Sequence, residues 1–566
     1  MKKIVRISMF FVISCFYLSS VLQAANKENI DKWVDLFEPS VLSKADRKKE
    51  LEWFSWAARD LRGMEIKSVG EDIRTHFWEA KVLAKAFFEI TGIKVTQDII
   101  NEGAIVNLIY RQIRTNSKLY DIYINDSDFI GTHLRLDSAL HFNEYMKGEG
   151  KDVTNPYLDL NDFLNLEFGK DYDGNLLQIP DQQFANLYWF RYDWFNRPEI
   201  KNAFHARYGY ELGVPLNWAA YEDIAEFFTG REIDGNKVYG HMDYGKKSPS
   251  LGWRFTDAWL SIAGVGDKGL PNGQPVDEWG IRVENNNPVG SSVERGGAVN
   301  SPAAVYALTK YVDWLKKYAP PFSVSMTWSE AGTAPARGNI AQRIFQYITW
   351  LSDESFTSPF SPVTDSEGKP LWRVAPTPHG KYWEEGMKVG YQDAGSWTIL
   401  KKSVKGKNRA AAWLWAQFCI SKTVSLKKFM VGMTPVRKST VHSKYLAQKE
   451  GDFGGIITFY KSSLENKWTP SGPNVPHYPL LAEHWAPNIR RAIDGLFTPQ
   501  QAMDSIARGM DSMMNKMRPK FYPPKLNPKK KQEYWLKQPG APKPEKTKDE
   551  KPETMVYEDL IRVWKQ

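Results

Sequence analysis

The chain has 566 residues, of which 42% are apolar and 14% aromatic, so it can bury one large core or two to three ordinary ones. Its formal net charge of +9 arises mainly at the ends, because residues 516–566 hold 14 Lys and Arg against seven Asp and Glu and residues 1–24 add three basic residues. The body between them is close to neutral, so its ligand need not be a polyanion such as nucleic acid.

Residues 1–24 run from a basic start through an apolar stretch to a small-residue site at Ala24, which predicts a cleaved secretory signal peptide rather than a stable membrane insertion. A second route is lipidation, because Val12–Cys15 resembles a lipobox. The apolar run before Cys15 is short and continues past it, so we favour cleavage after Ala24. The mature chain then keeps one cysteine, Cys419, and no internal disulfide.

The first part of the body alternates between helix-like and strand-like patterns. The pattern predicts helices over 44–63, 71–92 and 103–117 and strands over 64–69, 93–100 and 119–126. Such alternation is typical of an α/β fold with a largely parallel sheet, whose ligand crevice lies at the C-terminal ends of the strands. That rule places Gly70–Thr75 and Asn125–Asp128 at a crevice.

The second part begins with a long strand-like run over 175–195 and a loop-rich region over 240–302. A second strand-then-helix pattern covers 391–403 and 408–421. Eight prolines within residues 516–566 argue against a packed domain there, and the aromatic residues of this tail suggest that it lies against the body. Further helices are predicted over 218–230, 302–319, near 339–351, and over 480–495 and 499–517.

Motifs for common catalytic and cofactor chemistry are absent from the sequence. It contains no CxxC, HExxH, GxxxxGK[ST] or GxSxG, and its nine histidines lack metal-ligand spacing, so we expect no metal and no cofactor. The best enzymatic alternative is a secreted glycoside hydrolase that uses an Asp pair, either Asp126 with Asp128 or Asp181 with Asp393. Such a pair needs a separation on the order of 5–10 Å, and residues at a strand end are equally typical of turns and helix caps.

The stretch 180-PDQQFANLYWFRYDW-194 sets an acid and two amides ahead of a dense aromatic band. Carboxylates and amides bind hydroxyls while rings cover C–H faces, so the stretch suits a hydroxyl-rich ligand. The alternative is a core strand with a polar start.

Several blocks together resemble one family: 119-LYDIYINDSDFIGTH-133, 180-PDQQFANLYWFRYDWF-195, 391-YQDAGSWTILKKS-403 and 480-LLAEHWAPNIRRAIDG-495. The chain resembles a family 1 extracellular solute-binding protein of a bacterial ABC importer of sugar or polyol type. The block 240-GHMDYGKKSPSLGWRFTDAW-259 is similar to the long subgroup linked to glycerol transport. The resemblance implies a monomeric periplasmic receptor without enzymatic activity, whose partners are a small polyol or sugar and the permease subunits of the transporter.

The implied fold is the two-lobe α/β periplasmic-binding-protein fold of type II, with a ligand cleft between the lobes and an extended C-terminal tail. Carried onto this chain, the resemblance implies a signal peptide (1–24), an N-terminal helical segment (25–63), lobe 1 (64–180 and 389–440), lobe 2 (181–388 and 441–517) and the tail (518–566). A third hypothesis is that the chain is an interaction protein that binds its partner through the basic tail.

The same resemblance implies which residues face the cleft. Carboxylates rather than arginines at these positions favour a neutral ligand, best glycerol, while Arg74 and Arg254 leave glycerol phosphate as a less favoured alternative. The implied ligand-binding residues are Glu71, Thr75, Asn125, Asp126, Asp128, Asp181, Gln182, Gln183, Tyr244, Trp253, Tyr347, Gln392, Asp393, Trp397 and Trp485.

Overall fold

The computed structural model describes residues 27–565 except 126, 269–274, 348–350, 388, 390–391, 433, 464–471, 522–524 and 547–549, and it describes only the backbone of a few others, including 125, 392 and 393. The predicted signal peptide and the lipobox lie outside the described residues. Among the described helices, none is both long enough and apolar enough to cross a bilayer.

Lobe 1 is built around a five-stranded sheet with the order β2-β1-β3-β14-β4. The strands β1 (Glu65–Glu71), β2 (Lys94–Ile100) and β3 (Ile122–Asn125) run parallel, whereas β14 (Ser396–Thr398) is antiparallel to both of its neighbours, β3 and β4 (Ile179–Pro180). The predicted parallel sheet is therefore correct for the first three strands, and the late strand β14 makes the sheet mixed.

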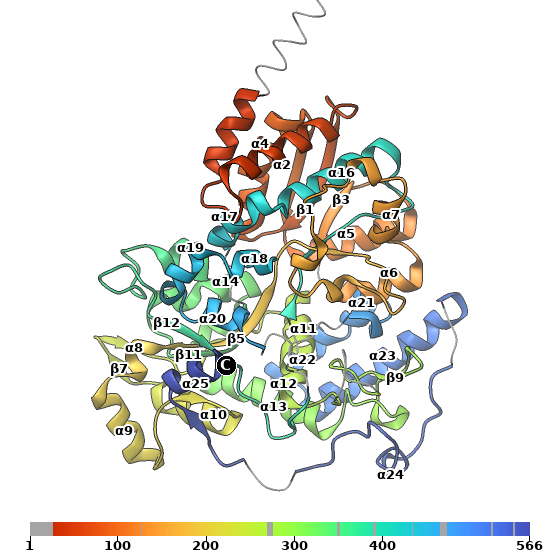
Figure 1. Ribbon diagram of the computed structural model, residues 1–566. Helices are drawn as coiled ribbons and strands as arrows, with labels where there is room; N and C mark the ends of the chain where they lie inside the picture. The colour runs from red at the N-terminus through yellow and green to blue at the C-terminus, as the bar shows by residue number, and fades with distance from the viewer. Residues whose placement is uncertain are drawn as a thin grey trace, which may run out of the picture.

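Helices cover both faces of this sheet (Figure 1). On one face, Phe87 of α4 and Phe418 of α16 lie in contact, with ring centroids 5.3 Å apart. On the other face, Ile105 and Ile109 of α5 pack with Val69 and Tyr123 of the sheet. The principal helices of lobe 1 are α2 (Lys44–Ala57), α3 (Arg74–Trp78), η1 (Glu79–Leu83), α4 (Ala84–Thr91), α5 (Glu102–Thr115), α6 (Ile130–Leu136), α7 (Phe142–Lys147), α16 (Gly406–Cys419) and α17 (Lys422–Gly432).

Lobe 2 is larger and centres on β5 (Phe184–Arg191), which is buried along its whole length. Three strands pair with it antiparallel: β11 (Gln342–Tyr347), β12 (Trp372–Ala375) and β13 (Gln392–Asp393). Its principal helices are α8 (Tyr192–Phe195), α9 (Pro198–Tyr208), α10 (Trp218–Phe228), α11 (Pro249–Trp253), η6 (Arg254–Trp259), α12 (Leu260–Ala263), α13 (Pro302–Lys317), α14 (Trp328–Thr333), α20 (Ile456–Lys461), α21 (Tyr478–Ala482), α22 (Trp485–Ile493) and α23 (Pro499–Phe521).

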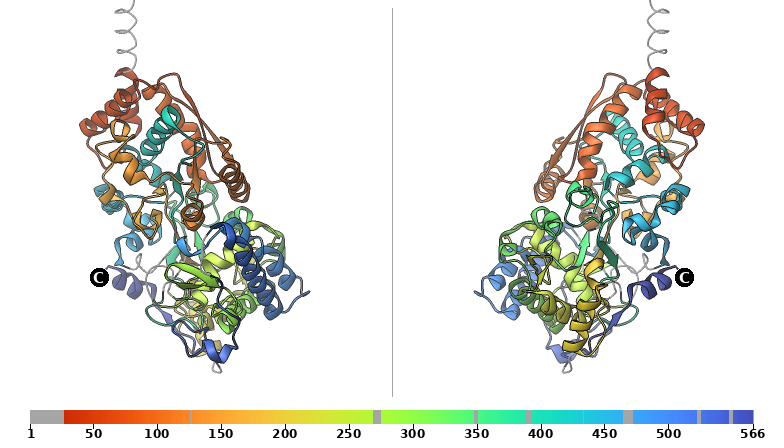
Figure 2. Two further views of the ribbon diagram at one scale, coloured as in Figure 1. Left: turned by 90° about the vertical axis from the view of Figure 1, so that its right-hand side faces the viewer. Right: turned by 90° about the vertical axis from the view of Figure 1, so that its left-hand side faces the viewer.

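Three segments of the chain join the lobes, and the last of them leads from α17 (Lys422–Gly432) of lobe 1 to α20 (Ile456–Lys461) of lobe 2. The first passes from β4 in the sheet of lobe 1 through residues 181–183 directly into β5 of lobe 2. The second returns from β13, paired with β5, to β14 in the sheet of lobe 1. Figures 1 and 2 show the lobes one above the other with these segments between them, an arrangement that permits hinge motion.

One predicted element is wrong. The pattern near 339–351 predicts a helix, but residues 342–347 form strand β11, which pairs with β5 through Gln342 to Phe190 and Tyr347 to Asn186. The segment is rich in Ile, Phe and Tyr, which also suit a strand. The adjacent edge of β5 offers backbone partners, so tertiary pairing decides between the two states.

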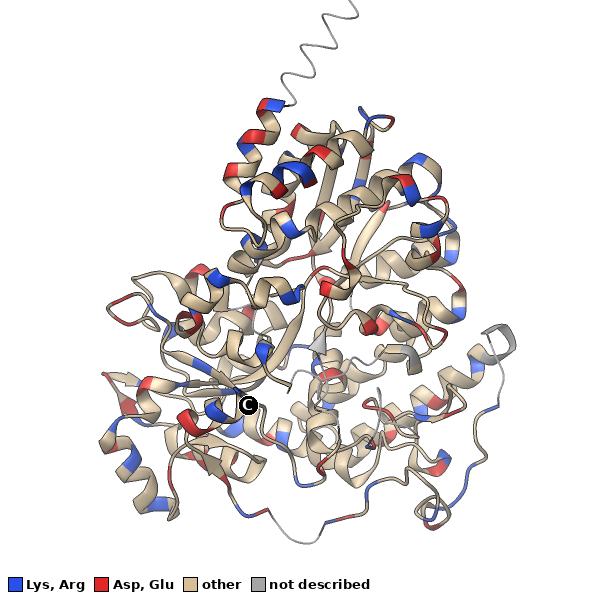
Figure 3. Cartoon of the chain, in the orientation of Figure 1, with Lys and Arg blue, Asp and Glu red and all other residues tan. Residues whose placement is uncertain are grey.

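The C-terminal tail is laid across lobe 2, as its aromatic residues suggested. It contributes α24 (Gln532–Trp535), β15 (Thr554–Met555), which pairs with β6 (Val214–Pro215), and α25 (Tyr557–Trp564). Figure 3 shows Lys and Arg recurring along the tail, while charges of both signs are spread over the two lobes.

Candidate functional site

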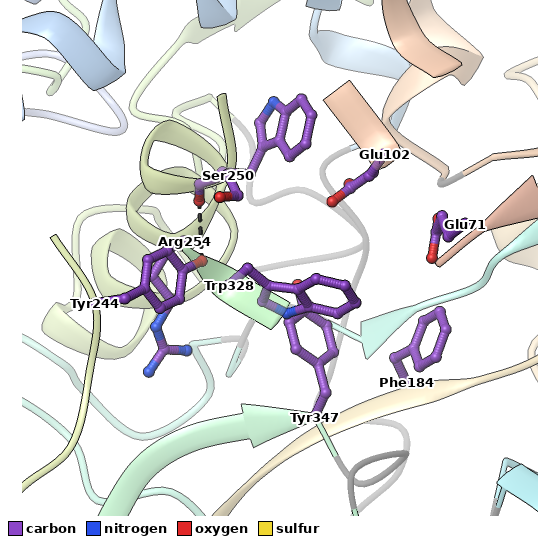
Figure 4. Close-up of a pocket in the computed structure, with 9 residues that line it drawn as sticks. Glu71, Glu102, Phe184, Tyr244, Ser250, Arg254, Trp328 and Tyr347 are labelled. Carbon is purple, nitrogen blue, oxygen red and sulfur yellow. Dashed lines mark hydrogen bonds between the residues drawn. The ribbon is translucent and has the colours of Figure 1, made fainter. Parts of the chain in front are cut away.

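A pocket lies where the two lobes face each other, and each lobe contributes a different kind of side chain (Figure 4). Lobe 1 supplies two carboxylates, Glu71 and Glu102. Lobe 2 supplies a mostly aromatic wall together with one serine and one arginine: Phe184, Tyr244, Ser250, Trp253, Arg254, Trp328 and Tyr347. Polar groups thus face rings across the gap, the combination that a hydroxyl-rich molecule requires.

The carboxylates are placed by the ends of neighbouring parallel strands. Glu71 is the last residue of β1, and Glu102 opens α5 two residues after β2 ends. The cap residue Asn101 fixes this turn, because its Oδ1 accepts a hydrogen bond from the Gly103 N–H at 3.0 Å. The N-terminus of α5 also stabilises negative charge on Glu102.

The aromatic wall is a small cluster around Tyr347. Its ring meets Phe184 edge to face at a centroid distance of 5.7 Å and meets Trp328 in the same way at 5.7 Å. Tyr347 ends β11 and Phe184 begins β5, so the pairing of these two strands brings their rings together. Edge-to-face contacts hold the rings in defined positions.

The arginine in the wall is already bound within lobe 2. Its Nη2 lies 2.8 Å from Asp243 Oδ2 and 2.7 Å from the Ile344 carbonyl oxygen, and its Nε donates to Asp243 Oδ1 at 3.1 Å. Burial alone would lower the pKa of Arg254, but the Asp243 carboxylate raises it above its ordinary value. Asp243 balances the charge of Arg254, so this arginine does not make the pocket an anion site.

The space between these side chains is small in this structure. Its cavity volume is about 10 Å³, enough for about one water molecule. A larger molecule enters this pocket only if the lobes separate or the rings move. The pocket is therefore suited to a ligand that the lobes enclose.

A second group of polar side chains is buried beside the first crossing segment. Lys428 Nζ of α17 lies 2.5 Å from Asp181 Oδ1 and 2.5 Å from Glu79 Oε1. The Trp397 indole N–H donates to the same Asp181 oxygen at 2.6 Å. All four side chains are buried, so this cluster ties the crossing segment to the interior of lobe 1.

Histidine 76 completes this cluster. Its Nε2 lies 3.0 Å from Gln182 Nε2 and 3.9 Å from Asp181 Oδ2, and its Nδ1 lies 3.0 Å from the Glu71 carbonyl oxygen. Burial lowers the pKa of His76 to about 4, and burial together with Glu79 raises the pKa of Asp181 to about 7. The cluster thus connects the end of β1 with the crossing segment.

His76, Glu79 and Asp181 have potential ligand atoms within 4.8 Å of one another, which is close enough for a metal ion. The Lys428 ammonium lies at hydrogen-bonding distance from both carboxylates and provides the positive charge that they need. We therefore assign no metal to this cluster.

The structure brings four of the predicted ligand residues to the pocket: Glu71, Tyr244, Trp253 and Tyr347. The crossing residues are placed differently from the expectation that they face the cleft. Asp181 and Gln182 point into the buried cluster, and Gln183 Nε2 donates to the Leu164 carbonyl oxygen at 3.1 Å. A buried carboxylate needs a compensating charge, and here Lys428 of lobe 1 supplies it.

Other predicted residues also lie away from this pocket. Trp397 belongs to the buried cluster, and Trp485 is fully buried between Phe255 and Trp279 in the core of lobe 2. Thr75 and Asp128 are likewise fully buried and do not line the pocket. Asp126 lies outside the described residues, as do the side chains of Asn125, Gln392 and Asp393, whose backbones belong to β3 and β13.

Sequence reasoning missed four lining residues, Glu102, Phe184, Ser250 and Trp328, and considered Arg254 only as a phosphate ligand. The rule that ligands bind at the C-terminal ends of parallel strands applies to β2 as well as β1, and it could have indicated Glu102. Trp328 opens α14, whose first turn carries a capping box of Thr327 and Glu330. That motif predicts a helix start but not the direction of the ring.

Comparisons with known proteins agree with this architecture. The family described as "Bacterial extracellular solute-binding protein" matches residues 75–424. The fold is similar to a solute-binding protein of Agrobacterium radiobacter K84 in complex with ribitol (TM-score 0.61, 18% identity, 80% of this chain and 99% of that chain). It is also similar to maltose-bound MalE3 of T. maritima (TM-score 0.60, 17% identity, 80% of this chain and 100% of that chain). A third similar structure is a solute-binding protein of Agrobacterium vitis S4 with bound D-mannitol (TM-score 0.58, 16% identity, 80% of this chain and 99% of that chain). These likenesses confirm the predicted two-lobe α/β fold.

Proposed function

Because the chain belongs to the family of bacterial extracellular solute-binding proteins, we propose that it captures a small neutral polyol or sugar between its lobes and delivers it to the permease of an ABC importer. Family membership also confirms the prediction that the chain is not an enzyme, so the glycoside hydrolase alternative is set aside. Within this proposal, glycerol is the specific ligand candidate, and the mature protein acts in the periplasm after removal of residues 1–24.

The observation that carries the proposal is the division of the pocket between the lobes. Carboxylates come from lobe 1 and rings come from lobe 2, so a polyol contacts both sets only when the lobes are together. A ligand shifts a conformational equilibrium by its differential affinity for the two states. Each hydrogen bond between a hydroxyl and a carboxylate contributes on the order of 1–3 kcal/mol, which favours the closed state.

The ion pair between Arg254 and Asp243 supports a neutral ligand over a phosphorylated one. Phosphate recognition uses arginines or lysines whose charge is directed at the ligand. Arg74, the other basic candidate, is exposed and does not line the pocket. We therefore rank glycerol 3-phosphate below neutral polyols.

The test is calorimetric titration of residues 25–566 with glycerol, ribitol, mannitol, maltose and glycerol 3-phosphate. We expect saturable one-to-one binding of a neutral polyol or sugar without turnover. Trp328→Ala and Tyr347→Ala should each weaken that binding by about tenfold or more, because each variant removes a ring from the wall. Trp56→Ala is the matched control, since Trp56 is half exposed on α2 of lobe 1.

The outcomes separate the parts of the proposal. If glycerol does not bind and a longer polyol or sugar does, the receptor function stands and the glycerol assignment is wrong. If glycerol 3-phosphate alone binds, the ligand is not neutral. If no compound in the panel binds, the polyol or sugar assignment fails.

A further inference from the structure

A second compartment opens beside the pocket, at the same boundary between the lobes. Trp253 lines both spaces and forms their shared wall. The second compartment has a cavity volume of about 230 Å³, against about 10 Å³ for the pocket itself. In this arrangement of the lobes, the second compartment is therefore the larger of these two spaces.

The base of the compartment is apolar. Val106 comes from α5 of lobe 1, whereas Trp253, Pro479 and Ala486 come from α11, α21 and α22, and all four residues are buried. The lobes meet closely there, because a Cβ atom on Gly103 would lie 3.1 Å from the Pro249 ring. Both lobes thus build this space, as they build the neighbouring pocket.

Apart from the half-buried Ser248, the residues with polar side chains that line the compartment are exposed. Asn107, Lys247 and Glu483 are exposed at its edge, where Lys247 is positively and Glu483 negatively charged. A hydroxyl held against Val106, Pro479 and Ala486 would lose its water without gaining a partner from these side chains, which is unfavourable. An alkyl or aryl group gains free energy there, and an apolar cavity of about 150 Å³ in another protein accommodates benzene.

From this juxtaposition we infer that the ligand has two parts: a hydroxyl-rich head in the pocket of Glu71, Tyr347 and Trp328, and an uncharged alkyl or aryl substituent in the apolar compartment beyond Trp253. The ligand class is then an ether or glycoside of a polyol or sugar. This inference rests on the proposed function, because it assigns the head group to the same pocket.

The experiment compares matched probes on the unmodified mature protein. Glycerol is titrated against 1-O-butylglycerol, and methyl β-D-glucopyranoside is titrated against phenyl β-D-glucopyranoside. Burial of a butyl or phenyl group should tighten binding by between about tenfold and a hundredfold over the smaller member of the pair. The inference is wrong if the larger member of every pair that binds has equal or weaker affinity.

A variant locates the substituent. Ala482 is half-buried on the compartment wall, and Ala482→Phe adds a ring to this space without changing any residue that lines the pocket. This variant should bring the two members of a pair to within about threefold of each other while the smaller member keeps its affinity. Ala206→Phe adds the same ring at an exposed position of α9 and should leave the gain intact.

Two further results have different meanings. If the substituent tightens binding equally in the unmodified protein and in Ala482→Phe, the apolar group binds elsewhere and the assignment of this compartment is overturned. If neither member of either pair binds, and none of the other polyols and sugars tested binds either, the proposed function fails and the inference fails with it.

Discussion

At the scale of single residues, one lysine holds the crossing segment in place. Lys428 forms ion pairs with both Asp181 and Glu79, and all three side chains are buried. Burial alone would lower the pKa of Lys428, but the Asp181 and Glu79 carboxylates raise it above its ordinary value. The two carboxylates therefore depend on this one ammonium group, and its removal should cost more than the loss of a surface ion pair.

We predict that Lys428→Met lowers the free energy of unfolding by about 3–5 kcal/mol, because it leaves buried carboxylates without their cation. Adding Asp181→Asn should restore part of the loss. Lys44→Met is the control, since Lys44 and its partner Asp35 are both exposed, and it should change stability little. Denaturant unfolding gives all three values, and a Lys428→Met protein as stable as the control would show that the cluster is not structurally important.

At the scale of elements, the C-terminal tail acts as a strap on lobe 2. Its strand β15 extends β6, its helix α25 packs on α20, and the Trp535 indole N–H donates to the Glu294 carbonyl oxygen at 2.7 Å. Leu560 and Trp564 form the buried face of α25. None of these residues lines the pocket or the second compartment, so the tail should support stability rather than ligand choice.

Trp564→Ala tests this role. The ring is 2% exposed and lies 5.9 Å from Phe459 between centroids, so its loss should destabilise lobe 2 by about 3–5 kcal/mol. The neighbouring Val563→Ala, at a 56% exposed position, should have little effect. Unfolding by denaturant measures the difference, while titration of the ligand identified above should give unchanged affinity. A large loss of affinity in folded Trp564→Ala would assign the tail a direct part in binding.

At the scale of the whole molecule, ligand capture should couple the two lobes. A ligand that touches Glu71 from lobe 1 and Tyr347 from lobe 2 binds the folded, closed protein and not the unfolded chain. At a concentration one hundred times its Kd it should add about 2.7 kcal/mol to the free energy of unfolding. This stabilisation involves both lobes because residues of each lobe contact the same ligand.

Calorimetric unfolding with and without the bound polyol or sugar measures this effect. We expect a higher Tm for the unmodified protein and a much smaller increase for Tyr347→Ala at the same ligand concentration, because that variant binds more weakly. The Trp56→Ala protein should respond as the unmodified protein does. Equal increases in all three proteins would indicate a general solute effect rather than binding between the lobes.

Local sequence patterns are enough to predict the alternation of strands and helices in lobe 1, the strand-like run that becomes β4 and β5, and a tail that forms no separate domain. These features depend on hydrophobic periodicity and on proline content, which are local properties of the chain. The segment at 342–347 shows the limit of that reasoning, since its helix or strand state depended on the free edge of β5.

Which polar and aromatic residues face the pocket depends on long-range packing. Asp181 and Trp397 carry the same chemistry as Glu71 and Tyr347, but Lys428 binds Asp181 inside lobe 1, and Asp181 in turn binds the Trp397 indole. Phe184 and Trp328 became pocket residues because distant segments placed their rings beside Tyr347. Ligand contact and core packing use the same types of side chain. Which of the two roles a side chain takes depends on which residues from distant parts of the sequence pack around it.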